Sequence, residues 1–186
     1  LINDAPIVLG GGVGGDDWRP QNINKRFYGP TPLREALVRS QNLVSVRLLR
    51  ATGIGPAMRH IAACGFSPEA TPPNLTFALG SGQVTPLEMT RGFAVFANGG
   101  FLVTPHVIER VADSEGREVF VTQAPVACVD CPGTTPAPQA ITAANAFVMT
   151  DILTDVIQRG TAQRAKTLGR SDLAGKTGTT SDRRDA

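Results

Sequence analysis

One stretch near the end of the sequence, Leu173-Ala-Gly-Lys-Thr-Gly-Thr-Thr180, carries the groups best suited to chemistry. Lys176 places an ammonium beside the hydroxyl of Thr177, and Gly178 has no side chain to keep a ligand away from the backbone. The hydroxyl and N–H groups that follow, beginning at Thr179, can point toward the same ligand. Donors of this kind suit a carboxylate or the oxyanion that develops during acyl transfer.

Two other interpretations fit this stretch. Gly175-Lys176-Thr177 matches the end of a nucleotide-binding P-loop, but that motif needs glycine at position 170, where this chain has Arg170. A helix should follow a P-loop, and Thr-Gly-Thr-Thr-Ser is a poor helix start. The other alternative is a strand that ends in a turn, because short Lys-Thr-Gly matches are common by chance.

A second candidate group is the polar tripeptide Ser40-Gln41-Asn42, which falls between two predicted helices. The first helix has Thr31 as its N-cap and Pro32 at its first position, and it reaches the tripeptide. The second runs from Leu43 to about residue 51 and stops at Gly53. At such a join the polar side chains can point away from the core; the alternative is a solvated link with no function.

Composition narrows the class of protein. With 186 residues and 41% hydrophobic content, the chain can form one domain, or most of one, around a sizeable core. The net charge of +2 gives no electrostatic argument for a nucleic-acid partner. No apolar run approaches the roughly 18 residues that a membrane span needs. Because the sequence starts at Leu1 rather than Met, we expect it to be a piece of a longer protein.

The three cysteines do not predict a metal site. Cys128 and Cys131 have the spacing of a metal knuckle or redox pair, but no second pair follows, and neither His60 nor His106 lies close in sequence. Prolines flank the pair, so we expect a loop that holds either a disulfide or two free thiols. Cys64 is predicted to be a small core residue. We expect no metal and no cofactor.

Further helices are predicted for residues 56–65, 87–97 and 141–159. Thr85 and Glu88 form a capping box before the second of these helices, which is mostly apolar and is expected to be largely buried. The apolar face expected for the last helix consists of Ala144, Phe147, Val148, Ile152 and Val156.

Strands are predicted for residues 5–9, 107–111, 117–121 and 173–180, with a hairpin turn at 113–116. The glycines within 10–15 match a dinucleotide fingerprint, but the helix that this motif requires does not follow. We therefore expect a flexible loop at about 10–20. The proline-rich residues 122–139 are expected to form a second flexible loop.

Ser40-Gln-Asn42 and Lys176-Thr-Gly178 stand in the order of two of the three signatures of the penicillin-recognising acyl-serine enzymes. Five longer stretches extend this similarity, and the chain resembles the transpeptidase domain of bifunctional class A penicillin-binding proteins from about residue 5 to its end. These stretches are Gly29–Ala36, Ala78–Met89, Phe96–Gly100, Gln158–Thr161 and Ala174–Thr180.

The resemblance implies a serine that attacks the D-Ala-D-Ala end of a peptidoglycan stem peptide, and an amine of a second stem peptide that takes the acyl group. β-Lactam antibiotics mimic the donor peptide and stall at the acyl-enzyme. By position, Ser40, hydrogen-bonded to Lys176, would relay a proton to the leaving amine. Asn42 would hold the substrate amide, and Lys176 would supply positive charge to the relay and to the donor carboxylate. The implied substrate-binding residues are Thr177 and Thr179, for the donor carboxylate and the oxyanion, and Gly178, which keeps the backbone open.

One signature of the family is missing. The residues three positions before the three lysines are Asn22, Gln163 and Leu173, so the chain contains no Ser-x-x-Lys motif. We expect the nucleophile to lie upstream of Leu1 and this chain by itself to be inactive.

Three related activities remain as alternatives. A β-lactamase would need Glu-x-x-Leu-Asn to activate water, whereas Glu69 is followed by Ala-Thr-Pro-Pro-Asn. A non-catalytic β-lactam sensor would be acylated once and then signal. A DD-carboxypeptidase fits less well, because the longer matches favour the class A type.

By resemblance, residues 1–186 are part of one domain with the α/β (α+β) acyl-serine transferase fold, in which an antiparallel sheet packs against a helical subdomain. The sheet is expected to be incomplete here, with residues 173–180 at the edge of the cleft. The parent chain is expected to add a glycosyltransferase domain and a membrane anchor, and to place this domain in the periplasm.

Overall fold

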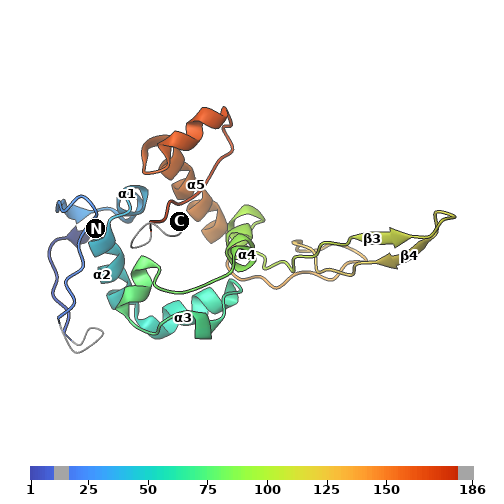
Figure 1. Cartoon of the computed structure of the whole chain (residues 1–186), viewed down its shortest axis with the longest axis horizontal. Coiled ribbons are helices and arrows are strands. Elements are labelled where there is room, and N and C mark those ends of the chain that lie inside the picture. The colour runs from blue at the N-terminus through green and yellow to red at the C-terminus, as the bar shows by residue number, and fades with distance from the viewer. Residues whose placement is uncertain (11–16, 180–186) are drawn as a thin grey trace. The chain divides into compact units, whose positions relative to one another are not determined.

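The computed structural model describes residues 1–10 and 17–179, and the chain divides into two compact units (Figure 1). Unit 1 consists of residues 1–58, 71–82 and 149–186, and unit 2 consists of residues 59–70 and 83–148. The predicted glycine-rich loop at 10–20 lies largely outside the described residues.

In unit 1, strand β1 (Ile2–Asp4) pairs antiparallel with β2 (Gly29–Thr31). The predicted strand at 5–9 is wrong, because within that range only Leu9 pairs, in a single bridge to Trp18. The carboxylate of Asp4 is fully buried, and the Nδ2 atom of Asn22 donates to its two oxygens at 2.9 and 3.0 Å. This contact fixes β1 against the segment that leads into β2.

Helices α1 (Leu33–Val38) and α2 (Asn42–Thr52) follow β2, as the sequence predicts. The predicted N-cap is wrong: Pro32 caps α1, while Thr31 pairs with Ile2 and its hydroxyl donates to the carbonyl of Gly29 at 3.0 Å. Apolar residues of α1, α2 and the end of α5 form the buried interior of unit 1. They are Ala36, Val38, Leu43, Val44, Val46, Leu49, Leu153, Val156 and Ile157.

Helix α3 (Ile54–Ala63) agrees with the predicted helix to within two residues at each end. Two short 3-10 helices follow, Pro68–Ala70 and Leu75–Leu79. The second packs against α2 in unit 1.

In unit 2, helix α4 (Pro86–Ala97) begins with the predicted capping box, in which Thr85 and Glu88 bond each other's backbone N–H. Its predicted burial is wrong, because only Gly92 and Val95 are buried and Leu87 is 60% exposed. The apolar composition of the helix did not reveal which side would be covered. The buried side packs around a small cluster formed by Cys64, Val95, Ile141 and Ala146.

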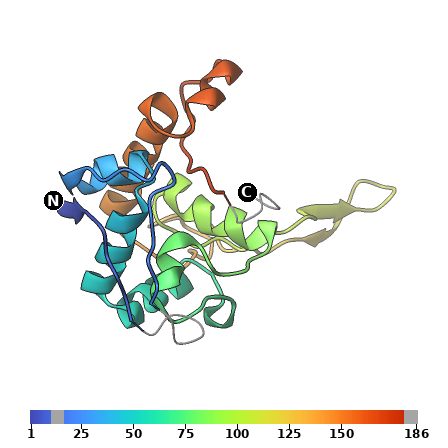
Figure 2. The ribbon, with the colours of Figure 1, turned by 60° about the vertical axis from the view of Figure 1, so that its left-hand side comes forward.

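Strands β3 (Arg110–Ala112) and β4 (Glu118–Val121) form the predicted hairpin, which projects as a two-stranded arm from unit 2 (Figures 1 and 2). Its turn is held by the Asp113 carboxylate, which accepts the backbone N–H of Glu115 and of Arg117. Residues 122–139 contain no regular element, and Cys128 and Cys131 form a disulfide within them. Of the two alternatives that the sequence left open, a disulfide or two free thiols, the structure contains the disulfide.

Helix α5 (Ala143–Arg159) begins two residues after its predicted start and ends where predicted, but its predicted apolar face is wrong. Of the five residues expected there, only Val156 is buried, and Phe147 is 72% exposed. The buried positions are instead Ala146, Leu153, Val156 and Ile157. Apolar residues occur on several sides of this helix, so helical spacing alone did not identify the packed side.

After a 3-10 helix at Gln163–Leu168, the chain reaches residues 173–179 without a regular element. The predicted strand is therefore wrong over these residues, since they pair with no strand of the described part. One backbone bond, from Gly175 N to Leu153 O at 3.3 Å, ties the segment to α5. The α/β fold class is confirmed, with two small antiparallel sheets among the described residues.

Candidate active site

Ser40 occupies the strained position at the end of α1. Its N–H donates to the carbonyl of Leu37 at 3.1 Å, and the N–H of Gln41 donates to that of Ala36 at 2.9 Å. This pair of bonds defines a Schellman motif, whose left-handed residue is usually glycine. Here that residue is Ser40, with φ of 54°. A serine in a glycine position indicates that its hydroxyl has a use that offsets the backbone strain.

Lys176 reaches this hydroxyl from the other end of the chain. Its Nζ donates to Ser40 Oγ at 2.8 Å and to the Thr177 carbonyl at 2.9 Å. The contact between Ser40 and Lys176 that a shared relay would require is therefore present. Burial lowers the pKa of the Lys176 ammonium, because the charged form loses hydration.

The next three residues present polar groups on an exposed segment. The hydroxyls of Thr177 and Thr161 lie 2.6 Å apart, so that Thr177 is linked to the chain just after α5. Gly178 and Thr179 are exposed, and the Thr179 hydroxyl donates to the Gly178 carbonyl at 2.8 Å. The backbone N–H groups on this exposed segment can face a ligand.

Asn42 is the first residue of α2 and is partly buried. Its Nδ2 donates to the Gln21 carbonyl at 2.8 Å, which fixes the orientation of the side-chain amide. No hydrogen bond joins it to Lys176 within the described ranges. The structure thus brings Ser40, Lys176 and Thr177 into one connected group and places Asn42 two residues from that group along the chain.

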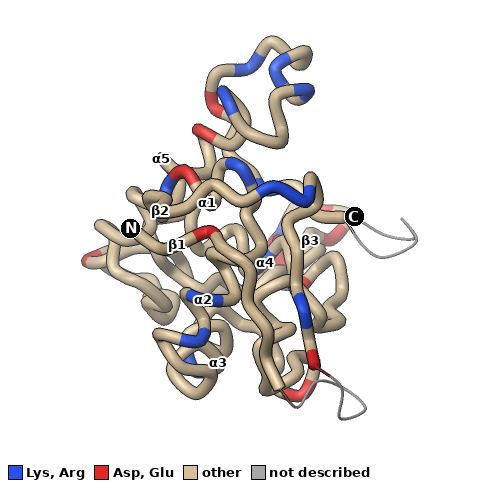
Figure 3. The backbone as a smooth tube through the Cα atoms, turned by 90° about the vertical axis from the view of Figure 1, so that its left-hand side faces the viewer, with Lys and Arg blue, Asp and Glu red and all other residues tan. Residues whose placement is uncertain are grey.

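Sequence reasoning missed an ion-pair network that positions α1 against the C-terminal part of α5. Arg159 donates to Glu35 at 2.6 Å and to Asp155 at 3.0 Å, and Asp155 also accepts from Arg34 at 2.9 Å. The Arg159 hydrogen bond is the main cause that lowers the pKa of Glu35. Basic and acidic residues lie side by side around these two helices (Figure 3). The signal was available in the four-residue spacing of charges along α5.

A second missed residue is Gly160. A Cβ there would lie 2.5 Å from the Val38 carbonyl oxygen, so only glycine fits without displacement. The close approach lets Thr161 N donate to Val38 O at 3.3 Å. Gly160 therefore sets the position of Thr161, the hydroxyl partner of Thr177.

Among residues 1–10 and 17–179, no three His, Cys, Asp or Glu side chains gather as a metal site would require. Within the same ranges, no helix has both the length and the apolar character needed to cross a membrane.

Comparison with known proteins identifies the family to which this chain belongs. Residues 2–184 match the family model "Penicillin binding protein transpeptidase domain". The chain belongs to this family.

Individual proteins and solved structures that are similar to this chain carry names that fit this family. Penicillin-binding protein 1A of Neisseria flavescens is 49% identical over 187 residues, which cover all of this chain and 23% of that protein. The crystal structure of penicillin-binding protein 1A from Haemophilus influenzae matches with a TM-score of 0.88 at 32% identity, over 96% of this chain and 31% of that one. The D,D-transpeptidase domain of a peptidoglycan glycosyltransferase from Eggerthella lenta shares the fold, with a TM-score of 0.69 at 24% identity over 97% of this chain and 49% of that one. The chain thus spans about a quarter of the length of the curated relative.

Proposed function

We propose that this chain forms part of a DD-transpeptidase that cross-links peptidoglycan stem peptides by serine acyl transfer. The observation that carries the proposal is the 2.8 Å hydrogen bond from Lys176 to Ser40, across 136 positions of sequence. It joins the two signature motifs into one polar group, as a shared proton relay requires. The attacking serine, with its Ser-x-x-Lys motif, belongs to a segment outside residues 1–186.

Acylation begins when that serine attacks the carbonyl between the two D-alanines of the donor peptide. The C–N bond breaks, and the leaving amine takes a proton through Ser40. Lys176 holds the Ser40 hydroxyl and stabilises negative charge that develops on the relay. In the second half, the amine of another stem peptide attacks the ester and releases the serine.

The residues after Lys176 bind the donor. The hydroxyls of Thr177 and Thr179 donate hydrogen bonds to the terminal carboxylate, and the Thr179 N–H is one arm of the oxyanion hole. Loss of one such donor typically lowers the rate about 10²–10³-fold. Gly178 leaves the backbone open to the peptide, and Asn42 holds a substrate amide.

We assign the rest of the function to the whole protein. It carries a glycosyltransferase domain and a membrane anchor, faces the periplasm, and is a target of β-lactam antibiotics, which acylate the same serine. It needs no cofactor, metal or nucleic acid. The names of two relatives support the penicillin-binding part of this assignment, since both the Neisseria and the Haemophilus protein are penicillin-binding proteins 1A.

Labelling with a fluorescent penicillin tests the proposal. The experiment uses a longer form of the protein that includes the upstream segment, and compares it with its Lys176→Ala and Lys166→Ala variants. Lys166 is a matched control, because among residues 1–10 and 17–179 its ammonium reaches only the Gln158 carbonyl, at 3.5 Å. We expect Lys176→Ala to slow acylation about 100-fold or more and Lys166→Ala to leave it unchanged. Equal labelling rates for the parent and Lys176→Ala would refute the proposed role.

The fate of the acyl group separates the related activities. Transfer to an amine supports the transpeptidase, rapid release to water indicates a β-lactamase or carboxypeptidase, and a permanent adduct without turnover of donor peptide indicates a sensor.

A further inference from the structure

A pocket of about 400 Å³ opens in unit 1 beside Ser40. Its walls come from the segment before β2, the join between α1 and α2, and the chain at the end of α5. The residues that line it include Asn24, Tyr28, Arg39, Ser40, Gln41 and Thr161. None of residues 176–179, which we assign to the donor peptide, lines this pocket.

Gln41 gives the first indication of a ligand. The residue is 3% exposed, yet neither Nε2 nor Oε1 of its side chain finds a hydrogen-bond partner in the part of the chain that the structure describes. A buried polar group without a partner destabilises the fold, because it has lost its hydrogen bonds to water. Gln41 lines the pocket, and a side-chain amide carries both an acceptor and donors. These are the groups that pair with the C=O and N–H of a peptide bond.

Arg39 gives the second indication. Its Nε donates to Glu35, and its guanidinium lies over the ring of Tyr28, 5.7 Å from the ring centre. The Tyr28 hydroxyl in turn accepts from Asn24 at 2.8 Å. These contacts hold the guanidinium, while its two terminal nitrogens bond no group within the described residues. A fixed guanidinium with free nitrogens suits a carboxylate.

The other arginine of the pocket is already engaged. Both terminal nitrogens of Arg159 donate to carboxylates, Glu35 at 2.6 Å and Asp155 at 3.0 Å. The charge available to a ligand is therefore that of Arg39.

We propose that this pocket binds the second stem peptide, which supplies the amine; this inference rests on the proposed transpeptidase function. A peptide bond of the acceptor pairs with Gln41, and a carboxylate of the acceptor pairs with Arg39. The transfer needs a place for a second peptide, and the pocket meets the relay at Ser40, a residue common to both. As the amine nitrogen bonds to the acyl carbon, the ester C–O bond breaks. One amine proton passes through Ser40 to the departing serine oxygen.

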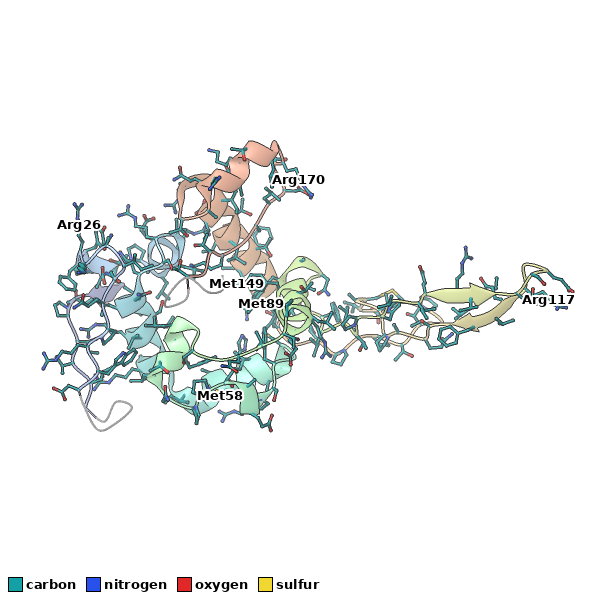
Figure 4. All side chains as sticks on the ribbon, viewed as in Figure 1. Arg26, Met58, Met89, Arg117, Met149 and Arg170 are labelled. Carbon is teal, nitrogen blue, oxygen red and sulfur yellow. A yellow bond between two sulfur atoms is a disulfide. The ribbon has the colours of Figure 1, made fainter. Side chains whose placement is uncertain are left out.

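The test measures acceptor use in a longer form of the protein that carries the upstream segment. A D-Ala-D-Ala peptide is the donor. The acceptor is a short amine-bearing peptide with a free carboxylate, compared with the same peptide as its carboxamide. The variants are Arg39→Gln and Gln41→Met, and the matched control is Arg117→Gln, an exposed arginine at the tip of the hairpin in unit 2 (Figure 4).

The measured quantity is the ratio of transferred to hydrolysed donor at limiting acceptor. The parent and Arg117→Gln should prefer the carboxylate acceptor. Arg39→Gln should lower the ratio for that acceptor roughly tenfold and abolish the preference, because a hydrogen bond to a charged group is lost. Gln41→Met should lower the ratio several-fold for both acceptors.

Two results would overturn the pocket assignment. One is a carboxylate preference in Arg39→Gln equal to that of the parent. The other is that Arg39→Gln lowers penicillin acylation as much as it lowers transfer, which would mean that Arg39 binds the donor or supports folding. Calorimetric binding of the carboxylate peptide needs no acylation, so it separates this proposal from the proposed function. Binding that Arg39→Gln weakens supports the pocket even if the parent is not acylated, and unchanged binding contradicts it.

Discussion

Replacing Ser40 by alanine and by glycine separates its backbone role from its chemical role. Both changes remove the hydroxyl that accepts from Lys176. Only glycine relieves the left-handed backbone at φ of 54°. The pair therefore measures conformational strain and function at one position.

The expected free energies follow from the structure. A left-handed conformation costs a residue with a Cβ roughly 1–2 kcal/mol. Glycine avoids this strain, but its greater freedom in the unfolded chain lowers the stability of the fold by about 0.4–1 kcal/mol. The balance makes Ser40→Gly about 1 kcal/mol more stable than Ser40→Ala. The lost hydrogen bond costs both variants about 1 kcal/mol. Ser40→Gly should thus nearly match the parent, while Ser40→Ala should fall below it.

Urea unfolding of the 186-residue chain, followed by the fluorescence of its one tryptophan, Trp18, measures these differences. Penicillin acylation of a longer form that includes the upstream segment measures the chemical role. Both variants should acylate at least about 100-fold more slowly, as expected for loss of a proton relay. An alanine variant as stable as the glycine variant would refute the backbone argument. Acylation of Ser40→Gly at the parental rate would refute the relay.

Three further predictions concern pH and packing. Burial lowers the pKa of Lys176, and its charged form acts in the relay, so the acylation rate should decline with rising pH at a pH below the usual lysine pKa of 10.5. A pH–rate profile whose alkaline decline is absent in Lys176→Arg would agree. A decline that begins only at pH 10.5 or above would contradict this prediction. Glu35 has a lowered pKa, so its ion pairs stabilise the fold above 4.5 and are lost as pH falls through the lower folded pKa. Glu35→Gln should therefore cost about 1 kcal/mol at pH 7 and nothing at the acid end, and a deficit in urea unfolding that does not change with pH would contradict this. Gly160→Ala should destabilise the chain by more than about 2 kcal/mol, because its Cβ would meet the Val38 carbonyl. Gly10→Ala has open space around it and should leave the stability unchanged. Equal thermal unfolding midpoints for these two variants would contradict the packing argument.

Local rules predicted the elements whose signals lie within a few residues. The capping box of Thr85 and Glu88 fixed the start of α4, and the turn before β4 follows from Asp113 and Gly116. The join at Ser40 was also predicted, because the helices on both sides carry clear stripes and stops. These features depend on hydrogen bonds between residues that are close in the sequence, so the local sequence predicts them.

Features that depend on distant partners could not be predicted in this way. The helical spacing of α5 did not distinguish the side with Ala146 and Leu153 from the side with Phe147. Residues 173–179 lack a strand because pairing needs a neighbour, which local sequence does not specify. The contact between Ser40 and Lys176 was expected only from the resemblance to a family and from the order of its motifs. The Gln41 amide and the terminal nitrogens of Arg39 have no hydrogen-bond partner among the described residues. No sequence signal could predict this, because it depends on what surrounds the two side chains.

We propose that Ser40 and Lys176 serve a nucleophile that lies outside this chain. Mass-spectrometric mapping of the penicillin adduct on the 186-residue chain, and on a longer form that includes the upstream segment, tests this proposal. We expect no stoichiometric adduct on the 186-residue chain. On the longer form we expect one adduct, at a serine outside residues 1–186 that has lysine three positions later. A saturable adduct on Ser40, or on any other residue of this chain, would contradict it.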